Sequence, residues 1–328
     1  MIRPFSTLTK MTPRHLISIG DLSPKELTKL VERGLVLKNW IKQENKAETD
    51  KMSDLMKGKT VPLIFSKRST RTRVSTEGAV AFLGGQPMFL GKDDIQLGVN
   101  ESTYDTARVV SSMTSCMVAR VGAHQEILDL SAASSVPVIN ALCEKYHPLQ
   151  AITDMITIKE TFGDAKNLKL AWVGDANNVL HDLAIAALKS GISVSAATPK
   201  EYPVSEDIVQ ICNDAAKESG ATFTTTTDPK EAVKDADIVV TDTWISMGQE
   251  SEKALKMQQF AGYQVTEELG KLAKPTWKFM HCLPRHPEEV SDEVFYSDRS
   301  LVFPEAENRL YAAIAVLEAF VVNKGKIE

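Results

Sequence analysis

The segment VPLIFSKRSTRTRVSTEGAVAFLGG (61–85) passes from a short apolar run into a basic, hydroxyl-rich turn and then into a helical pattern. The run at 61–65 is typical of a buried strand. Ser69 or Thr70 is a good N-cap for the following helix, which is expected to end at the glycine pair 84–85. A strand that leads through a turn into a helix is characteristic of crossover units between parallel strands. This segment therefore predicts an α/β protein.

The same alternation continues along the chain. Helical patterns of about 10 to 15 residues separate most of the apolar runs, which favours mostly parallel sheets. Such sheets bind ligands at the carboxyl ends of their strands. The further strands are predicted at 87–91, 117–121, 136–140, 168–174, 192–198, 237–243 and 277–283.

Two domains are expected, because 328 residues exceed what one hydrophobic core usually supports. The helical stretch 148–163 separates two groups of strands and marks the junction. The last segment, 304–322, carries an apolar stripe at helical spacing and should pack on one of the domains. The predicted division is a polar tail or presequence remnant at 1–15, a first domain at 16–152 together with the C-terminal helix 304–323, and a second domain at 153–303.

The composition, 43% apolar and 25% charged residues, is that of an ordinary soluble globular protein. No apolar run approaches the roughly 18 to 20 residues of a membrane span, so no membrane association is expected. The four cysteines are scattered in a large chain, which predicts free thiols in a reducing compartment.

The N-terminal fifteen residues contain Arg3, Lys10 and Arg14 with hydroxyl residues between them, and no acidic residue precedes Asp21. This composition suits a short mitochondrial presequence or its remnant, and hence the mitochondrial matrix. The alternative is a disordered polar tail on a cytoplasmic protein.

The basic turn is a candidate anion site. From Leu55 to Thr76 there are six basic residues and no acidic one, although the whole chain carries a net charge of −5. A helix N-terminus with free N–H groups, hydroxyls and arginines is best matched to a phosphate. A nucleic-acid surface would normally be broader, so no nucleic-acid partner is expected. The alternative is a solvated basic turn.

Five further motifs accompany the STRTR turn (69–73), and together they resemble the ornithine transcarbamylases from end to end. They are HPLQ (147–150), DANN (175–178), DTWISMG (242–248), HCLPR (281–285) and the ENR of the last helix (307–309). The resemblance implies two doubly wound α/β domains bridged by helices, assembled as a homotrimer. It also implies transfer of a carbamoyl group from carbamoyl phosphate to the side-chain amine of L-ornithine, giving citrulline, with no cofactor and no metal. The first domain would then bind carbamoyl phosphate and the second ornithine.

The carbamoyl-phosphate site follows from the resemblance. Carbamoyl phosphate has an anionic leaving group and a carbonyl oxygen that becomes negative during attack, so both ends need preorganised donors. The implied phosphate ligands are Ser69, Thr70, Arg71, Thr72 and Arg309. Arg120 would lie between phosphate and carbonyl, and Thr72 and His147 would reach the carbonyl oxygen. Gln150 would hold the carbamoyl amide; its three-residue spacing from His147 lets both point into one site.

The loop DDIQLGVNES (93–102) is polar and opens the next helix. In the family this loop crosses to the adjacent subunit, so the resemblance implies active sites shared between subunits, with Gln96 as the phosphate contact. The alternative is an ordinary surface loop.

Ornithine would be held by the second domain. The resemblance assigns Asp242 to the α-amino group, and Asn178, Ser246 and Met247 to the amino-acid end. The polar segment that begins at SMG (246–248) has the character of a closing lid. The alternative for this segment is a solvated linker.

The HCLPR motif contains Cys282, but no triad spacing surrounds it. An amine that attacks an already activated carbamoyl group needs no covalent enzyme intermediate. The family pattern instead puts Cys282 and the Leu283 carbonyl beside the reacting centre, where they orient the substrates, with Arg285 alongside.

The sequence leaves two other classes of protein as alternatives. The strand, turn and helix at 168–182 suggest a dinucleotide-binding oxidoreductase, but Ala176 and Val179 follow Gly174 where a GxGxxG fingerprint needs glycines. A catalytically inactive paralogue is the second alternative, and no motif residue that can be aligned is missing.

Overall fold

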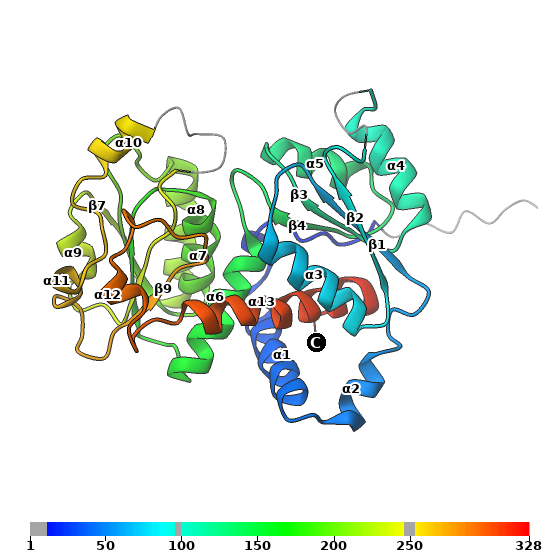
Figure 1. Cartoon of the computed structure of the whole chain (residues 1–328), viewed down its shortest axis with the longest axis horizontal. Helices are drawn as coiled ribbons and strands as arrows, with labels where there is room; N and C mark the ends of the chain where they lie inside the picture. Colours follow the sequence, from blue (N-terminus) through cyan, green and yellow to red (C-terminus); the bar gives the residue numbers. More distant parts are fainter. Residues whose placement is uncertain (1–11, 96–99, 246–252, 328) are drawn as a thin grey trace, which may run out of the picture.

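The computed structural model describes residues 12–95, 100–245 and 253–327. Within these ranges the chain forms two parallel β-sheets, each with helices around it, and helices that run between the two (Figure 1). The predicted fold class, two parallel-sheet α/β domains, is confirmed.

The first sheet has the strand order β2-β1-β3-β4, and all its pairings are parallel. Its inner strands β1 and β3 are almost entirely buried, as their continuous apolar runs require. The strands are β1 (Thr60–Phe65), β2 (Gln86–Gly91), β3 (Met117–Arg120) and β4 (Val138–Leu142). The connecting helices are α3 (Thr70–Phe82), α4 (Thr103–Met113) and α5 (His124–Ala133).

The second sheet has the order β7-β6-β5-β8-β9, again with parallel pairings. Its strand order reverses direction at β5, where ligands of doubly wound sheets commonly bind. The strands are β5 (Lys169–Val173), β6 (Ser193–Ala197), β7 (Phe223–Thr226), β8 (Ile238–Val240) and β9 (Lys278–Met280). The helices are α7 (Asn178–Lys189), α8 (Glu206–Ser219), α9 (Pro229–Val233), α10 (Lys253–Gln259), α11 (Glu267–Gly270) and α12 (Asp292–Phe295).

Two long helices connect the two halves of the molecule: α6 lies between the sheets, and α13 starts beside the second sheet and runs along the first domain (Figure 1). The helix α6 is continuous across the expected domain junction at 152/153. The helix α13 passes from β9 toward the first domain, packs against α1, α3 and α6, and continues into a π-helical segment, η3. The predicted return of the C-terminal helix to the first domain is confirmed. The remaining elements are η1 (Ile19–Asp21), α1 (Pro24–Lys42), α2 (Lys46–Met52), α6 (Pro148–Phe162), α13 (Val302–Leu317) and η3 (Glu318–Val322).

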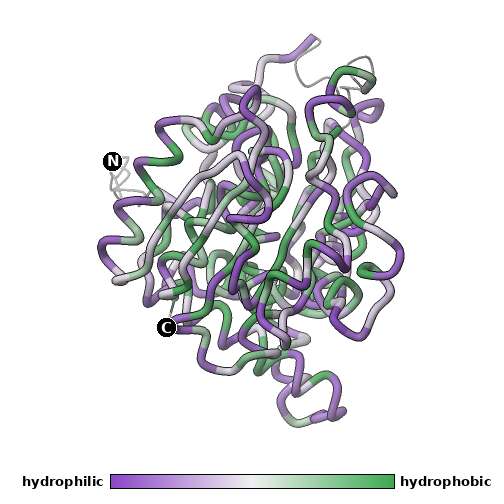
Figure 2. The backbone as a smooth tube through the Cα atoms, turned by 90° about the vertical axis from the view of Figure 1, so that its left-hand side faces the viewer, coloured by the Kyte–Doolittle hydropathy of each residue, from purple (hydrophilic) through white to green (hydrophobic). Residues whose placement is uncertain are grey.

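Hydrophobic residues lie mainly along the strands and the inner faces of the helices, and hydrophilic residues along the outer turns (Figure 2). The helices α6 and α13 are buried along most of their length, because α6 packs against α7, α13 and α1, and α13 packs against α1, α3 and α6. None of the helices in the described ranges combines the length and apolarity needed to cross a membrane.

Three details differ from the expectations. The strand β7, FTTT, was not predicted, because it lies at the sheet edge and lacks an apolar run. The predicted strand 237–243 is shorter in the structure, where only Ile238–Val240 form β8. Just beyond it, Thr241 Oγ1 donates to Val173 O at 2.6 Å. Arg14 and His15, at the end of the expected polar tail, contact the first domain: Arg14 pairs with Glu26, and His15 Nδ1 accepts from the Val138 N–H.

Candidate active site

The predicted site residues follow the carboxyl ends of strands in both sheets. The STRTR turn follows β1, and Arg120 ends β3. Ser69 is the N-cap of α3, and its Oγ accepts from the Thr72 N–H at 3.3 Å, which starts the helix at the turn. Arg71, on the first turn of α3, donates from Nη2 to Leu283 O of the second domain at 2.5 Å. The turn thus joins the two domains.

Three guanidinium groups and an imidazole gather at this helix N-terminus. Burial, together with the positive charge of neighbouring guanidinium groups, lowers the pKa of Arg120 and of Arg309 to about 10. Burial and the charges of Arg309, Arg120 and Arg71 hold the pKa of His147 well below its usual range, so this imidazole is neutral at pH 7. So concentrated a positive charge favours an anionic ligand.

Three side-chain nitrogen atoms in this cluster are free to bind such a ligand. Arg120 Nε, Arg309 Nε and His147 Nδ1 are buried and have no hydrogen-bond partner among the residues that the structure describes. Buried polar atoms are nearly always paired, so unpaired ones that converge on a positive site indicate ligand contacts.

Arg309 connects α13 with α3 and α6 at the site. Its Nη2 donates to Thr72 Oγ1 at 2.9 Å, and its Nη1 donates to Gln150 Oε1. Gln150 in turn donates from Nε2 to Asp154 Oδ1 at 2.6 Å and to Glu305 Oε1 at 3.1 Å. Arg309, Thr72 and Gln150 are all predicted site residues, and the structure brings them together.

The second domain contributes a carboxylate. Asp242, just beyond β8, accepts from Asn177 Nδ2 at 2.7 Å and from Cys282 Sγ at 3.2 Å. Burial and the Asp242 carboxylate raise the pKa of the Cys282 thiol well above its ordinary value, so the thiol is protonated at neutral pH. A protonated thiol is a poor nucleophile, in line with the expectation that Cys282 orients substrates.

Asn178, which is predicted to hold the amino-acid end of ornithine, is the first residue of α7 and contacts the first domain. Its Nδ2 donates to Cys143 O of the first domain at 2.6 Å, whereas its neighbour Asn177 caps α7 and contacts Asp242. Arg285 is likewise engaged within the second domain, where its Nη2 donates to Val290 O at 3.3 Å and its guanidinium lies 4.7 Å from the Phe295 ring centre.

Three predicted site residues, Gln96, Ser246 and Met247, lie outside the described residues. Sequence reasoning missed Asn177, Asp154 and Glu305. Spacing offered a signal for the last two, because Asp154 follows Gln150 by four positions and Glu305 precedes Arg309 by four, which places each pair on one helix face.

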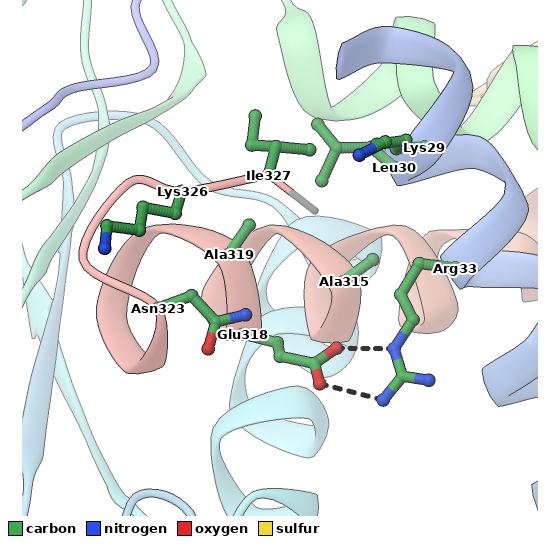
Figure 3. A pocket seen from close by; sticks show the side chains of 9 residues that line it. All are labelled: Lys29, Leu30, Arg33, Ala315, Glu318, Ala319, Asn323, Lys326 and Ile327. Atoms are coloured by element: carbon green, nitrogen blue, oxygen red, sulfur yellow. Dashed lines mark hydrogen bonds and ion pairs between the residues drawn. The ribbon is translucent and has the colours of Figure 1, made fainter. Parts of the chain in front are cut away.

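A separate pocket of about 230 Å³ lies where α1, the end of α13 and the C-terminal residues meet (Figure 3). In it Arg33 forms an ion pair with Glu318, with Nε 2.7 Å from Oε2 and Nη2 2.8 Å from Oε1. No predicted site residue lines this pocket. In the described part of the chain, no group of three or more His, Cys, Asp or Glu side chains is arranged to hold a metal ion.

Comparison with known proteins matches both domains. Residues 14–160 match the family model "Aspartate/ornithine carbamoyltransferase, carbamoyl-P binding domain", and residues 166–320 match "Aspartate/ornithine carbamoyltransferase, Asp/Orn binding domain". The mitochondrial ornithine carbamoyltransferase of Coccidioides immitis is 60% identical over 96% of this chain and 95% of its own length. That of Schizosaccharomyces pombe is 60% identical over 97% of each chain.

Solved structures agree with the sequence relatives. The crystal structure of the Coccidioides immitis enzyme matches with a TM-score of 0.90 and 58% identity, over 97% of this chain and 100% of that one. The ornithine carbamoyltransferase of Pyrococcus furiosus matches with a TM-score of 0.89 and 44% identity, over 95% and 98% of the two chains. By sequence, fold and site geometry, this chain belongs to the ornithine transcarbamylase family, within the aspartate/ornithine carbamoyltransferases.

Proposed function

We propose that this protein transfers the carbamoyl group of carbamoyl phosphate to the side-chain amine of L-ornithine, forming L-citrulline and phosphate, a step of arginine biosynthesis. A C–N bond forms as the amine attacks the carbonyl carbon, the C–O bond to phosphate breaks, and the proton lost by the amine passes to the departing phosphate. The observation that carries this proposal is the convergence of Arg71, Arg120, Arg309 and a neutral His147 on the N-terminus of α3.

The donors of this cluster have distinct roles in the proposal. The α3 N-terminus and its arginines hold the phosphate and stabilise the charge that it gains as it leaves. His147 and Thr72 donate to the carbonyl oxygen as it becomes an oxyanion. The residues proposed for carbamoyl phosphate are Ser69, Thr70, Arg71, Thr72, Gln96, Arg120, His147, Gln150, Cys282, Leu283 and Arg309.

Ornithine is proposed to bind against the second sheet. Asp242 receives the α-amino group, and Asn178, Ser246 and Met247 hold the amino-acid end. The hydrogen bond from Asn177 Nδ2 supports this role of Asp242, because it orients the carboxylate and still leaves oxygen lone pairs for an ammonium group.

The attacking amine must be neutral. An alkylamine has a pKa near 10.4, so about one in a thousand is neutral near pH 7.5, a cost of roughly 4 kcal/mol. Burial and the nearby guanidinium charges lower the pKa of such an amine. We therefore assign no dedicated general base. The protonated Cys282 supports direct attack without a covalent intermediate.

The proposed assembly is a homotrimer whose active sites are shared between subunits. Exposed apolar side chains on α3, β2 and α4 of the first domain support an interface there; they are Val74, Met88, Tyr104, Val109 and Met113. The proposed compartment is the mitochondrial matrix, supported by the basic, acid-free N-terminus and by relatives whose names include "mitochondrial".

The test is a citrulline-forming assay with carbamoyl phosphate and four acceptors, namely ornithine, acetylornithine, putrescine and aspartate. We expect a strong preference for ornithine in kcat/KM. A preference for any other acceptor would refute the substrate assignment, and no product from any acceptor would refute carbamoyl transfer itself.

A further inference from the structure

The amide of Gln150 is held by three charged or titratable side chains from two helices. Its Nε2 donates to Asp154 on α6 and to Glu305 on α13, and its Oε1 accepts from Arg309 Nη1. The four side chains are buried, with exposed fractions of 1% for Gln150, 2% for Asp154 and Glu305, and 5% for Arg309.

This arrangement selects one of the two orientations of the amide. A carboxylate accepts hydrogen bonds and a guanidinium only donates them, whereas a primary amide has an NH2 group on one side and an oxygen on the other. The reversed amide would turn its NH2 toward the Arg309 guanidinium and its oxygen toward two carboxyl groups. Asp154 and Glu305 therefore keep Gln150 Oε1 on the side of Arg309, where the phosphate-binding donors lie.

The two carboxyl groups form a pair. Asp154 and Glu305 are hydrogen-bonded to each other, and burial raises the pKa of both. Two adjacent buried carboxyls are stable when one proton lies between them, and the pair can then still accept both N–H groups of Gln150. Glu305 Oε2 also accepts from the His281 N–H at 3.0 Å, so the pair is connected to the backbone that leads to Cys282.

We propose that Asp154 and Glu305 are positioning residues that turn the Gln150 oxygen toward the NH2 group of carbamoyl phosphate, and thereby select a carbamoyl group over an acyl group. This inference rests on the proposed function. An oxygen held in the site accepts a hydrogen bond from a carbamoyl NH2 but is left unpaired against a methyl group, and unpaired buried acceptors are unfavourable. Acetyl phosphate, which carries a methyl group in that position, is the matching probe.

The test compares two substitutions of similar volume. Asp154→Asn keeps an oxygen that accepts from Gln150 and supplies an N–H for Glu305, whereas Asp154→Leu removes the acceptor. Thr153→Val is the matched control, because Thr153 is buried on the same helix and its hydroxyl donates only to Leu149 O at 2.7 Å. The measurements are kcat and KM for carbamoyl phosphate, and the inhibition constants of acetyl phosphate and inorganic phosphate.

For Asp154→Leu we expect kcat/KM for carbamoyl phosphate to fall about tenfold or more, while inhibition by inorganic phosphate stays within about twofold of wild type. Discrimination against acetyl phosphate should fall by a similar factor. Asp154→Asn should retain at least about a third of wild-type kcat/KM, and Thr153→Val should match wild type. In a Gln150→Ala background, adding Asp154→Leu should change kcat/KM less than about twofold, because the effect acts through Gln150.

Three results would overturn the proposal: equal weakening of carbamoyl phosphate and inorganic phosphate, equal damage from the Asn and Leu substitutions, or additive losses in the Gln150→Ala background. If Asp154→Leu fails to fold, Glu305→Gln is tested in its place. Both oxygens of Glu305 accept hydrogen bonds, so the NH2 group introduced by the substitution must face another donor, either Gln150 Nε2 or the His281 N–H. Citrulline formation by wild type and by Thr153→Val tests the proposed function separately, because the Asp154–Glu305 pair is unaltered in both proteins.

Discussion

Arg309 Nη2 donates a hydrogen bond to Thr72 Oγ1 at 2.9 Å, across 237 positions of sequence. The same guanidinium donates from Nη1 to Gln150 Oε1. One planar group therefore fixes the relative positions of α13, α3 and α6 beside the proposed phosphate site. A lysine at this position would carry the charge but has a single nitrogen, so it could not reproduce this geometry.

We predict that Arg309→Lys lowers kcat/KM for carbamoyl phosphate about ten- to hundredfold. The positive charge is kept, but a lysine cannot donate to Thr72 and Gln150 from two nitrogens of one planar group. Steady-state citrulline formation measures it. The matched control is Arg33→Lys, which likewise keeps the charge but removes the two-bond geometry of an ion pair with Glu318 away from the site (Figure 3). An equal loss in both variants would mean that general packing, and not the site, depends on Arg309.

Arg71→Ala is predicted to lower turnover at least about a hundredfold with the fold intact, because it removes a preorganised cation from the transition state. Turnover is measured by citrulline formation and folding by circular dichroism. Arg68→Ala is the control: Arg68 is exposed in the same basic stretch and should lose at most about threefold, through weaker steering of the anion. A folded and fully active Arg71→Ala variant would refute the role of Arg71.

Mixing inactive subunits tests the shared site. A chain with Arg71→Ala and a chain with Gln96→Glu should each be inactive. In the proposed trimer, however, hybrids of the two chains would contain interfaces that join a wild-type loop to a wild-type turn. After exchange about one quarter of the sites should be intact, so a minority of wild-type activity should return. Exchange is verified with differently tagged subunits. Verified exchange without recovered activity would remove Gln96 from the site and leave it in an ordinary surface loop.

The buried carboxyl of Asp182 predicts a pH dependence of stability. Asp182 Oδ1 accepts from the Ile19 N–H at 2.8 Å, and burial raises the pKa of this carboxyl to about 8. Because the folded state keeps a proton that the unfolded chain releases above about pH 4, the free energy of unfolding should fall as pH rises toward 8, by up to about 1.4 kcal/mol per unit. The contribution of Asp182 to stability is fully present below about pH 4, and it is lost as the pH rises to the folded-state pKa of about 8.

Asp182→Asn removes that titration, so the stability of the variant relative to wild type should increase steadily between pH 5 and pH 8. Urea unfolding of both proteins at pH 5, 6.5 and 8 gives the difference between their free energies of unfolding. The titrating groups that the two proteins share cancel in this difference. A constant difference across this range would show that Asp182 is ionised in the folded protein.

The sequence predicted most strands because parallel strands covered on both faces have continuous apolar runs. It missed β7, whose Thr-rich edge strand has no such run. The site motifs were predicted from resemblance, yet the distinction between Asn177 and Asn178 depends on which residue caps α7, and helix ends are uncertain by a residue or two from sequence. The pairing of Asp154 with Glu305 could not be predicted, because it depends on how α6 and α13 pack.

The position of α13 also determines when the protein can become active during its synthesis. Both sheets end before residue 302, so a nascent chain can complete every strand while its last helix is still inside the ribosome. Such a chain lacks Arg309 and Glu305, and the first domain lacks the helix that packs on α1, α3 and α6. A chain that stops before Glu305 should therefore lack the proposed activity as completely as a chain that stops early, although every strand of both sheets is present in it.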